Sequence, residues 1–342
     1  MYIEGTAMPT WLIASALGMQ VQGTQVSFHP QVSGAFTVNN LYISHNGEHA
    51  WIDYRRSAQG CETFEIHENS GLQLTSANFI TRTWQGGTSG DWNTPANWGG
   101  TLPDCNTNVT IPSGAHITLS ADAAVQNLNI SPGAWLDLGF HSLSVEGTLT
   151  NQGTLTQSGV VDAACTNGNG CPLGEISTSD GMSTRYAGVY IHPTGADANM
   201  GVVELTIRGH QTCGNSGTLQ NSVQRCFEIS PANPQPAEIT FYYHVNETNA
   251  NAAPVVWHYL GGGAWEGEQT TARGANGVWH WVQASGIDAY SPFALADAQP
   301  TALRLTRLQG NSPAGFSWPI PVLAITGALV LIHLRHKHHE IA

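Results

Sequence analysis

The fold is decided by residues 125–150, which read VQNLNISPGAWLDLGFHSLSVEGTLT. Within this stretch, apolar residues recur at every second position in short runs, and the runs are separated by the turn sequences Ser-Pro-Gly, Gly-Phe-His and Glu-Gly. The apolar pairs are Leu128/Ile130, Leu136/Leu138 and Leu143/Val145. A period of two indicates β-strands, and the closely spaced turns favour stacked coils of a β-solenoid or a tight meander.

A similar pattern occurs earlier in the chain. Residues 38–44 read VNNLYIS and residues 125–131 read VQNLNIS, and each is followed by a glycine turn and then by Ala-Trp-Ile-Asp or Ala-Trp-Leu-Asp. A repeat with this order indicates two structural units of similar plan. We expect a partial, degenerate β-repeat unit at 1–80 and a second unit at 81–160. Each coil has to stack on another to bury its apolar face.

The C-terminal half is again rich in β-patterns. Residues 202–207 and 238–245 alternate as strands do, and Asn276-Gly277 is hairpin-turn chemistry because both residues tolerate positive φ. We expect an antiparallel β-sandwich over 185–300. A Gly/Asn-rich linker that contains Cys165 and Cys171 is expected at 161–184. The predicted fold class is therefore all-β, with β-solenoid-like repeat units and an antiparallel β-sandwich.

Composition limits the classes of partner. Of 342 residues, 11 are Lys or Arg and 24 are Asp or Glu, which gives a net charge of −13. Charged residues make up 10 %, against roughly 25 % in an ordinary domain. Binding to nucleic acid needs clustered basic residues, so this balance argues against a nucleic-acid partner and against an anionic polysaccharide held in a basic groove. The low charge and 38 glycines suggest an extracellular all-β protein.

The six cysteines suggest an oxidising compartment. No Cys-x-x-Cys pair occurs, which excludes the zinc-ribbon and thioredoxin patterns. Cys165 and Cys171 would close a short loop, and Cys213 and Cys226 flank a polar stretch that could be a hairpin tip; Cys61 and Cys105 are left over. We expect disulfides, with six buried free thiols as the alternative.

A membrane anchor is predicted near the C-terminus. Residues 316–334 read FSWPIPVLAITGALVLIHL, from Phe316 to Leu334, without an Asp, Glu, Lys or Arg. A helix of this length spans roughly 28 Å, close to the thickness of the hydrocarbon core. Trp318 suits the membrane interface, and the basic tail at 335–342 contains Arg335 and Lys337, the only lysine. We expect a linker at 301–315, one transmembrane helix at 316–334 and a cytoplasmic tail. A buried core helix or strand pair is the alternative.

Two segments resemble modules of bacterial surface proteins. Residues 84–98 read WQGGTSGDWNTPANW, and VTIPSG follows at 109–114. From about residue 83 to 157, the chain is similar to haemagglutinin-like β-solenoid repeats of secreted proteins. That resemblance implies an adhesive or spacer role and supplies no catalytic residues.

The segment that ends in SPFAL at 291–295 resembles a β-sandwich that precedes the anchor of many bacterial secreted proteins. In this chain Tyr290 replaces the Phe that is usual in that family, and Ala296 replaces the usual Gly. The resemblance implies a terminal structural or sorting module.

Few residues suggest chemistry. Trp84, Trp92 and Trp98 could form a platform for stacking on a sugar, or they could cap the open end of the coils. His336, His338 and His339 could ligate a metal, but a solvated cluster beside the membrane is the preferred interpretation, so no metal site and no cofactor are predicted. The sequence has no Gly-x-Ser-x-Gly, His-Glu-x-x-His or P-loop motif.

Together these patterns predict a non-enzymatic, membrane-anchored bacterial surface protein, adhesin-like or a structural spacer. We expect it to be the C-terminal part of a larger exported protein. Its expected partners are the membrane and, at the cell surface, glycans or other surface proteins. Two alternatives stay open: a carbohydrate-binding surface module and a β-helix polysaccharide-degrading enzyme.

Overall fold

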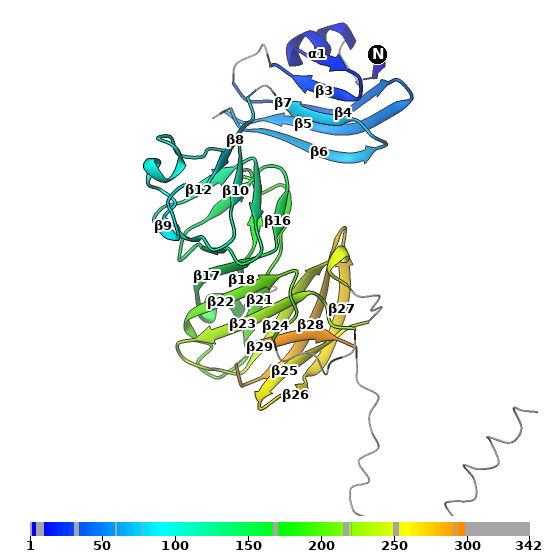
Figure 1. The fold of residues 1–342 in the computed structure, drawn as a ribbon. Helices are drawn as coiled ribbons and strands as arrows, with labels where there is room; N and C mark the ends of the chain where they lie inside the picture. The colour runs from blue at the N-terminus through cyan, green and yellow to red at the C-terminus, as the bar shows by residue number, and fades with distance from the viewer. Residues whose placement is uncertain are drawn as a thin grey trace, which may run out of the picture. The chain divides into compact units, whose positions relative to one another are not determined.

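The computed structural model shows a chain built almost entirely of β-strands, with one α-helix and short 3-10 helices among the described residues (Figure 1). This confirms the all-β prediction. The structure describes residues 2–4, 10–30, 34–58, 60–76, 78–166, 170–214, 219, 221–248, 253–290 and 292–297.

The first part of the chain forms two small sheets. An antiparallel sheet has the order β1-β4-β5-β6, and a second sheet has the order β2-β3-β7. Their buried core includes Leu17 from the helix, Phe28 and Tyr54. The elements are β1 (Tyr2–Glu4), α1 (Thr10–Leu17), β2 (Gln20–Gln22), β3 (Gln25–Phe28), β4 (Phe36–His45), β5 (Glu48–Arg56), β6 (Glu62–Asn69) and β7 (Gln73–Ser76).

The likeness between the two repeated sequence stretches does not extend to their strand pairing. In the first stretch Leu41 on β4 pairs antiparallel with Ile52 on β5. The reason is the turn between the strands: Asn46 and Gly47 have φ of 51° and 86°, so the chain reverses within two residues and closes a hairpin. The first of the two similar stretches is therefore an antiparallel hairpin rather than a coil of parallel strands.

The second stretch belongs to three ladders of parallel strands. One ladder has the order β16-β13-β10-β8, another runs β17-β14-β11-β9, and a third pairs β12 with β15. The chain visits the ladders in turn, so each pass adds a strand to them. The strands are β8 (Ile80–Thr83), β9 (Ser89–Asp91), β10 (Thr107–Ile111), β11 (His116–Thr118), β12 (Ala123–Val125), β13 (Asn127–Ile130), β14 (Trp135–Asp137), β15 (Leu143–Val145), β16 (Leu149–Asn151) and β17 (Thr154–Val161).

Apolar side chains stack in columns along these ladders. Ile117, Leu136 and Leu155 occupy matching positions on β11, β14 and β17, and all three are fully buried. The alternation seen in the sequence thus places each Leu or Ile against its counterpart on the next pass. Parallel strands in register make this stacking possible because side chains of the same face lie directly above one another.

Strand β17 continues one of these ladders into the C-terminal part. It pairs parallel with β14 and antiparallel with β22, so a single sheet of the described residues has the order β26-β25-β29-β23-β22-β17-β14-β11-β9. A second sheet runs β18-β21-β24-β28-β27. The C-terminal strands are β18 (Cys171–Leu173), β19 (Ile176–Ser177), β20 (Thr184–Tyr186), β21 (Val189–Pro193), β22 (Gly201–Gly209), β23 (Arg225–Pro231), β24 (Ala237–His244), β25 (Val255–Gly261), β26 (Ala264–Gly267), β27 (Gln269–Asn276), β28 (Trp279–Ile287) and β29 (Pro292–Ala296).

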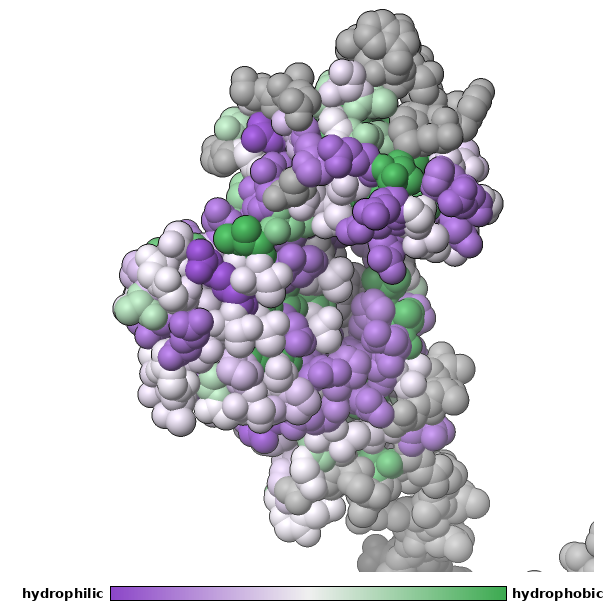
Figure 2. Space-filling view, turned by 45° about the horizontal axis from the view of Figure 1, so that its top comes forward, coloured by the Kyte–Doolittle hydropathy of each residue, from purple (hydrophilic) through white to green (hydrophobic). Residues whose placement is uncertain are grey.

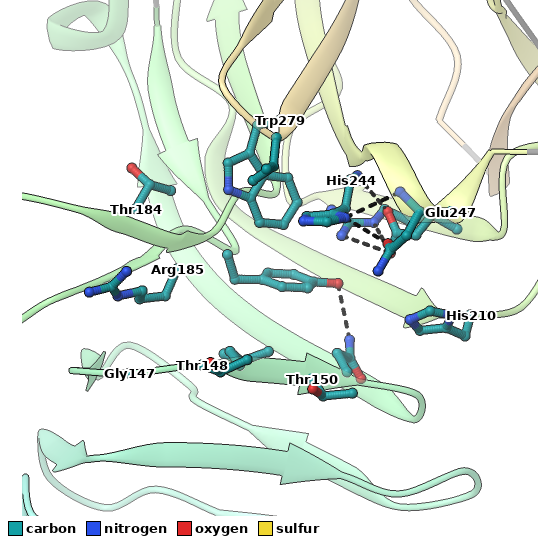
Figure 3. Close-up of a pocket in the computed structure, with 15 residues that line it drawn as sticks. Gly147, Thr148, Thr150, Thr184, Arg185, His210, His244, Glu247 and Trp279 are labelled. Atoms are coloured by element: carbon teal, nitrogen blue, oxygen red, sulfur yellow. Dashed lines mark hydrogen bonds and ion pairs between the residues drawn. The ribbon is translucent and has the colours of Figure 1, made fainter. Parts of the chain in front are cut away.

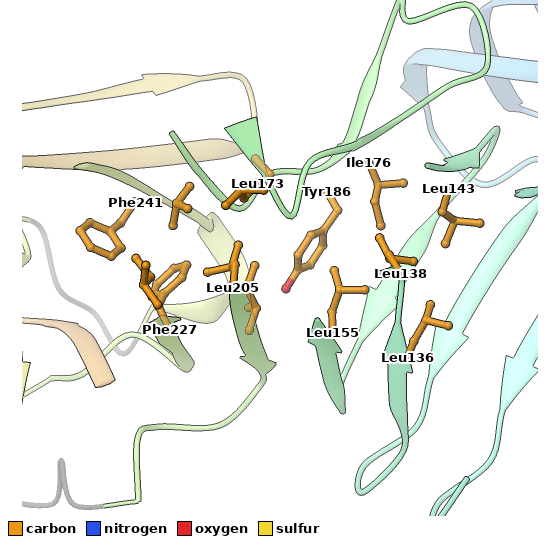
Figure 4. Packing of buried hydrophobic residues seen from close by; sticks show 14 of the residues in the cluster. Leu136, Leu138, Leu143, Leu155, Leu173, Ile176, Tyr186, Leu205, Phe227 and Phe241 are labelled. Carbon is orange, nitrogen blue, oxygen red and sulfur yellow. The ribbon is translucent and has the colours of Figure 1, made fainter. Parts of the chain in front are cut away.

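The expected linker at 161–184 is part of the packed structure. It contains the 3-10 helix η2 (Ala163–Thr166) together with β18 and β19, and Leu173 and Ile176 are buried. Figure 4 shows Tyr186 packed between Leu205 and Phe227 on one side and Leu138 and Leu155 on the other. The sequence did not indicate that this segment is packed, because it is rich in turn residues and its apolar residues are few and widely spaced.

The outer surface is mostly polar. In the face drawn in Figure 2, hydrophilic and neutral residues cover most of the described surface, and hydrophobic residues form small separate patches. Within the described ranges, no helix is both long enough and apolar enough to cross a bilayer. The predicted anchor at 316–334 and the tail with Arg335 and Lys337 lie outside the described residues.

Candidate functional site

The three tryptophans considered as a sugar platform lie in the core. Trp84, Trp92 and Trp98 are 5 %, 1 % and 1 % exposed. Trp98 contacts the other two edge-on, with ring centroids 5.2 Å from Trp84 and 4.7 Å from Trp92. Burial leaves their ring faces covered by protein, so this cluster cannot stack on a sugar. Trp84 follows β8, Trp92 follows β9 and Trp98 ends η1 (Pro95–Trp98). Strands β8 and β9 are the terminal strands of their ladders, so the three rings cap the core at that end.

The spacing of the tryptophan motif has a local explanation. The indole N–H of Trp84 donates to the Gly87 carbonyl at 2.9 Å, and that of Trp98 donates to the Trp92 carbonyl at 2.6 Å. Gly86 lies against Trp84 and Asn97, where a Cβ atom would come within 2.3 Å of the indole. The glycines and Asn97 therefore serve the packing of the cap.

Three disulfides close the described cysteines in pairs: Cys61–Cys105, Cys165–Cys171 and Cys213–Cys226. The short-loop and hairpin pairs are those suggested by spacing. The remaining pair joins the loop between β5 and β6 to the loop before β10, so it bridges segments that are 44 residues apart. Beside it, the Thr63 hydroxyl donates to the buried Glu146 carboxylate at 2.9 Å.

A cavity of about 330 Å³, lined by both polar and apolar side chains, lies where the β8–β16 ladder ends. One neighbouring ladder continues through β17 into β22, whereas β16 is an edge strand of its sheet. The cavity lies between the β16 edge and residues of the C-terminal sheets, among them Tyr186, Arg225 and Trp279. Figure 3 shows Thr148 and Thr150 on one side and Trp279 on the other, with His244 and Glu247 close to each other and His210 apart from them.

A buried ion pair forms one wall of this cavity. The Arg225 guanidinium donates to Glu247 Oε1 through Nε at 3.2 Å and Nη2 at 3.0 Å, and both side chains are at least 97 % buried. Arg225 also donates through Nη1 to the carbonyls of Ala187 and Tyr242. The second Glu247 oxygen accepts from the His244 backbone N–H at 2.7 Å. Buried charges need such complete pairing, because removing one partner leaves an uncompensated charge.

Aromatic rings enclose the guanidinium. Arg225 Cζ lies 4.4 Å from the centroid of Tyr186 and 5.3 Å from that of Trp279. The Tyr186 hydroxyl accepts a hydrogen bond from the Asn151 amide at 3.1 Å. Burial raises the pKa of Tyr186 to about 12, so its hydroxyl is neutral at physiological pH. Cation–π contact and ion pairing together hold Arg225 charged, and its pKa is raised by the nearby Glu247 carboxylate despite burial.

The polar groups at the mouth of the cavity make fewer hydrogen bonds than Arg225 and Glu247 do. His210, at the end of β22, is exposed and has a φ of 50°. Its imidazole has no hydrogen-bond partner within the described part of the chain. His244 donates or accepts at Nδ1 with Asn246 at 2.6 Å. These histidines and the threonine hydroxyls can donate and accept hydrogen bonds.

Sequence reasoning did not find this cavity. Arg225 begins the strand β23, and Glu247 lies in a polar stretch without a motif. The available signal was a single arginine beside the apolar run of β23, since a buried arginine needs a carboxylate partner. The terminal histidines weighed as a metal site lie outside the described residues, and no cluster of three His, Cys, Asp or Glu suited to a metal occurs within them.

A scan against protein-family models, a search of curated proteins and a search of solved structures return no match for this chain. The resemblance to bacterial surface modules stays a prediction.

Proposed function

We propose that this chain is a non-enzymatic structural module of an exported bacterial surface protein, a spacer or adhesin-like stalk tethered through 316–334. The observation that carries the proposal is the set of three disulfides that closes all six cysteines. Disulfides persist in oxidising compartments and are rare in the cytosol.

The arrangement of strands supports the same role. The three parallel ladders support a proposed stack of β-coils, and their outward positions carry mostly Thr, Ser and Asn. Stacked passes of this kind bury apolar side chains without any large exposed apolar surface. The polar groups deepest in the cavity are bonded to one another, which suits a structural junction.

The test is a fractionation of bacteria that export the full chain and a variant that lacks residues 316–342. The full chain is expected in the membrane fraction and accessible to external protease, whereas the shortened chain is expected in the soluble exported fraction. A shortened chain that sediments with membranes as the full chain does would contradict the anchor. Protection of the full chain from external protease would contradict the surface location.

A further inference from the structure

We propose that the cavity between β16, Tyr186 and Trp279 is a binding site for one neutral saccharide unit. The proposal is separate from the structural role above and rests on the chemistry of the cavity. Its volume, about 330 Å³, lies at the small end of the roughly 300–1,000 Å³ range of ligand pockets. That size suits a single sugar ring rather than a long chain.

His210 is the first observation that points to a ligand. It is a non-glycine residue with φ of 50° and an exposed, unpartnered ring among the described residues at the cavity mouth. The preceding residue is held in place, because Gly209 N–H donates to the Gly153 carbonyl at 2.9 Å. An imidazole at a defined place can bond a hydroxyl group.

The edge of β16 is the second observation. The Thr148 carbonyl accepts from Leu128 N–H, and Gln152 N–H donates to the Ile130 carbonyl. Backbone groups alternate in direction along a strand, so those of Leu149 point to the edge that lines the cavity. With the hydroxyls of Thr148 and Thr150, this edge offers both donors and acceptors to a ligand rich in hydroxyl groups.

The charge balance selects a neutral ligand. Arg225 is neutralised by Glu247 at 3.0 Å, and Arg185 lies 3.3 Å from Glu65. Among the described lining residues, each Arg side chain is already paired with a carboxylate. An anionic ligand would therefore meet no unpaired Arg there, and a cationic ligand would meet no unpaired carboxylate. Tyr186 and Trp279 are 3 % and 8 % exposed and their rings lie against Arg225, so the exposed Val278 supplies the apolar surface for the CH groups of a sugar ring.

The cavity is too restricted for an added peptide strand. A Cβ atom on Gly209 would lie 2.1 Å from the Asn151 carbonyl oxygen, so the end of β22 already covers that part of the β16 edge. Only the backbone groups of Leu149 remain for pairing, and strand addition needs a longer open edge. A small polar molecule fits this geometry better than an extended chain.

The experiment is a titration of the 342-residue chain with glucose, galactose, N-acetylglucosamine and cellobiose, followed by saturation-transfer NMR and calorimetry. At least one sugar is expected to bind by about 10 mM, where a millimolar site is nearly saturated. His210→Asn removes the ring but keeps a residue that tolerates positive φ. It and Thr150→Val should each weaken binding about three- to tenfold, the effect of losing one hydrogen bond.

His141→Asn and Thr118→Val are matched controls, since both residues lie outside the cavity lining. They should leave the affinity unchanged. Circular dichroism checks that every variant keeps its fold. The proposal is overturned if no neutral sugar binds or if the cavity variants bind as the parent does.

Discussion

Gly86 controls how closely Trp84 and Asn97 approach in the cap. Its φ is outside the left-handed region, so an alanine is allowed by the backbone, but its Cβ would lie 2.3 Å from Trp84. Gly86→Ala is therefore expected to lower the free energy of unfolding by about 1–3 kcal/mol, the usual cost of overpacking. Chemical denaturation measures this effect.

Gly214→Ala is the control for that substitution, because a Cβ there meets nothing within 4 Å. It should change the stability by less than about 0.5 kcal/mol. Equal effects of both substitutions would show that close packing of the cap is not what Gly86 provides.

The buried hydroxyl of Tyr186 should make the free energy of unfolding fall at alkaline pH. Burial raises the pKa of Tyr186 to about 12, above the ordinary 10 of the unfolded chain. The folded state thus holds its proton longer than the unfolded state does. The associated stability is complete below pH 10 and falls as pH rises towards 12, by about 3 kcal/mol in all.

The measurement is the denaturation midpoint of the parent chain and of Tyr186→Phe at several pH values. Burial also raises the pKa of Tyr54, Tyr190 and Tyr290, so the informative quantity is the difference between the two proteins. The variant should be less stable near pH 8, because it loses the Asn151 bond, and this deficit should shrink above pH 10. A constant deficit would contradict a neutral, buried Tyr186.

The burial of single residues could be predicted from the sequence more readily than their side-chain contacts. The alternation of Leu128 and Ile130 is local, and both residues are buried as their pattern indicates. The contact of Arg225 with Glu247 joins residues 22 positions apart, and no spacing rule predicts it. The cap is the favoured interpretation for Trp92, and its burial agrees with it, but the sequence pattern by itself does not distinguish a capping ring from a solvent-facing one.

At the scale of elements, β17 is the strand on which two parts of the fold depend. It pairs with β14 on one edge and with β22 on the other. Leu155→Ala in this strand removes a fully buried side chain and should cost about 2–5 kcal/mol. Hydrogen exchange should show faster exchange in both β14 and β22.

Val160→Ala on the same strand is the control, since Val160 is 57 % exposed. It should alter stability little. If Leu155→Ala accelerates exchange in only one of the two neighbouring strands, the shared strand does not couple them.

Elements were predictable where the signal is short-range. Strands follow from alternation, but whether neighbours run parallel depends on the turn between them. Asn46-Gly47 reverses the chain into a hairpin, whereas Ser131-Pro-Gly-Ala134 leads to a strand in another ladder. Weighing the turn chemistry would have separated the two similar stretches. The continuation of one sheet through β17 is a long-range pairing, and no local feature indicates it.

For the whole molecule, the disulfides should differ in their effects. Closing a longer loop removes more entropy from the unfolded chain. The sequence separations are 44, 13 and 6 residues for the Cys61, Cys213 and Cys165 pairs. Replacing each pair with alanines should therefore cost about 4, 3 and 2 kcal/mol, respectively. Chemical denaturation of the three double variants checks this order, and the reverse order would contradict the loop-closure account.

The central claim is that the described body of this protein resides in an oxidising space outside the cytosol. The most direct measurement is differential alkylation of the cysteines in intact cells, followed by mass spectrometry of the native chain. The account predicts three linked pairs, Cys61–Cys105, Cys165–Cys171 and Cys213–Cys226, with no free thiol. Six alkylated thiols in folded protein from the cytosol would contradict it.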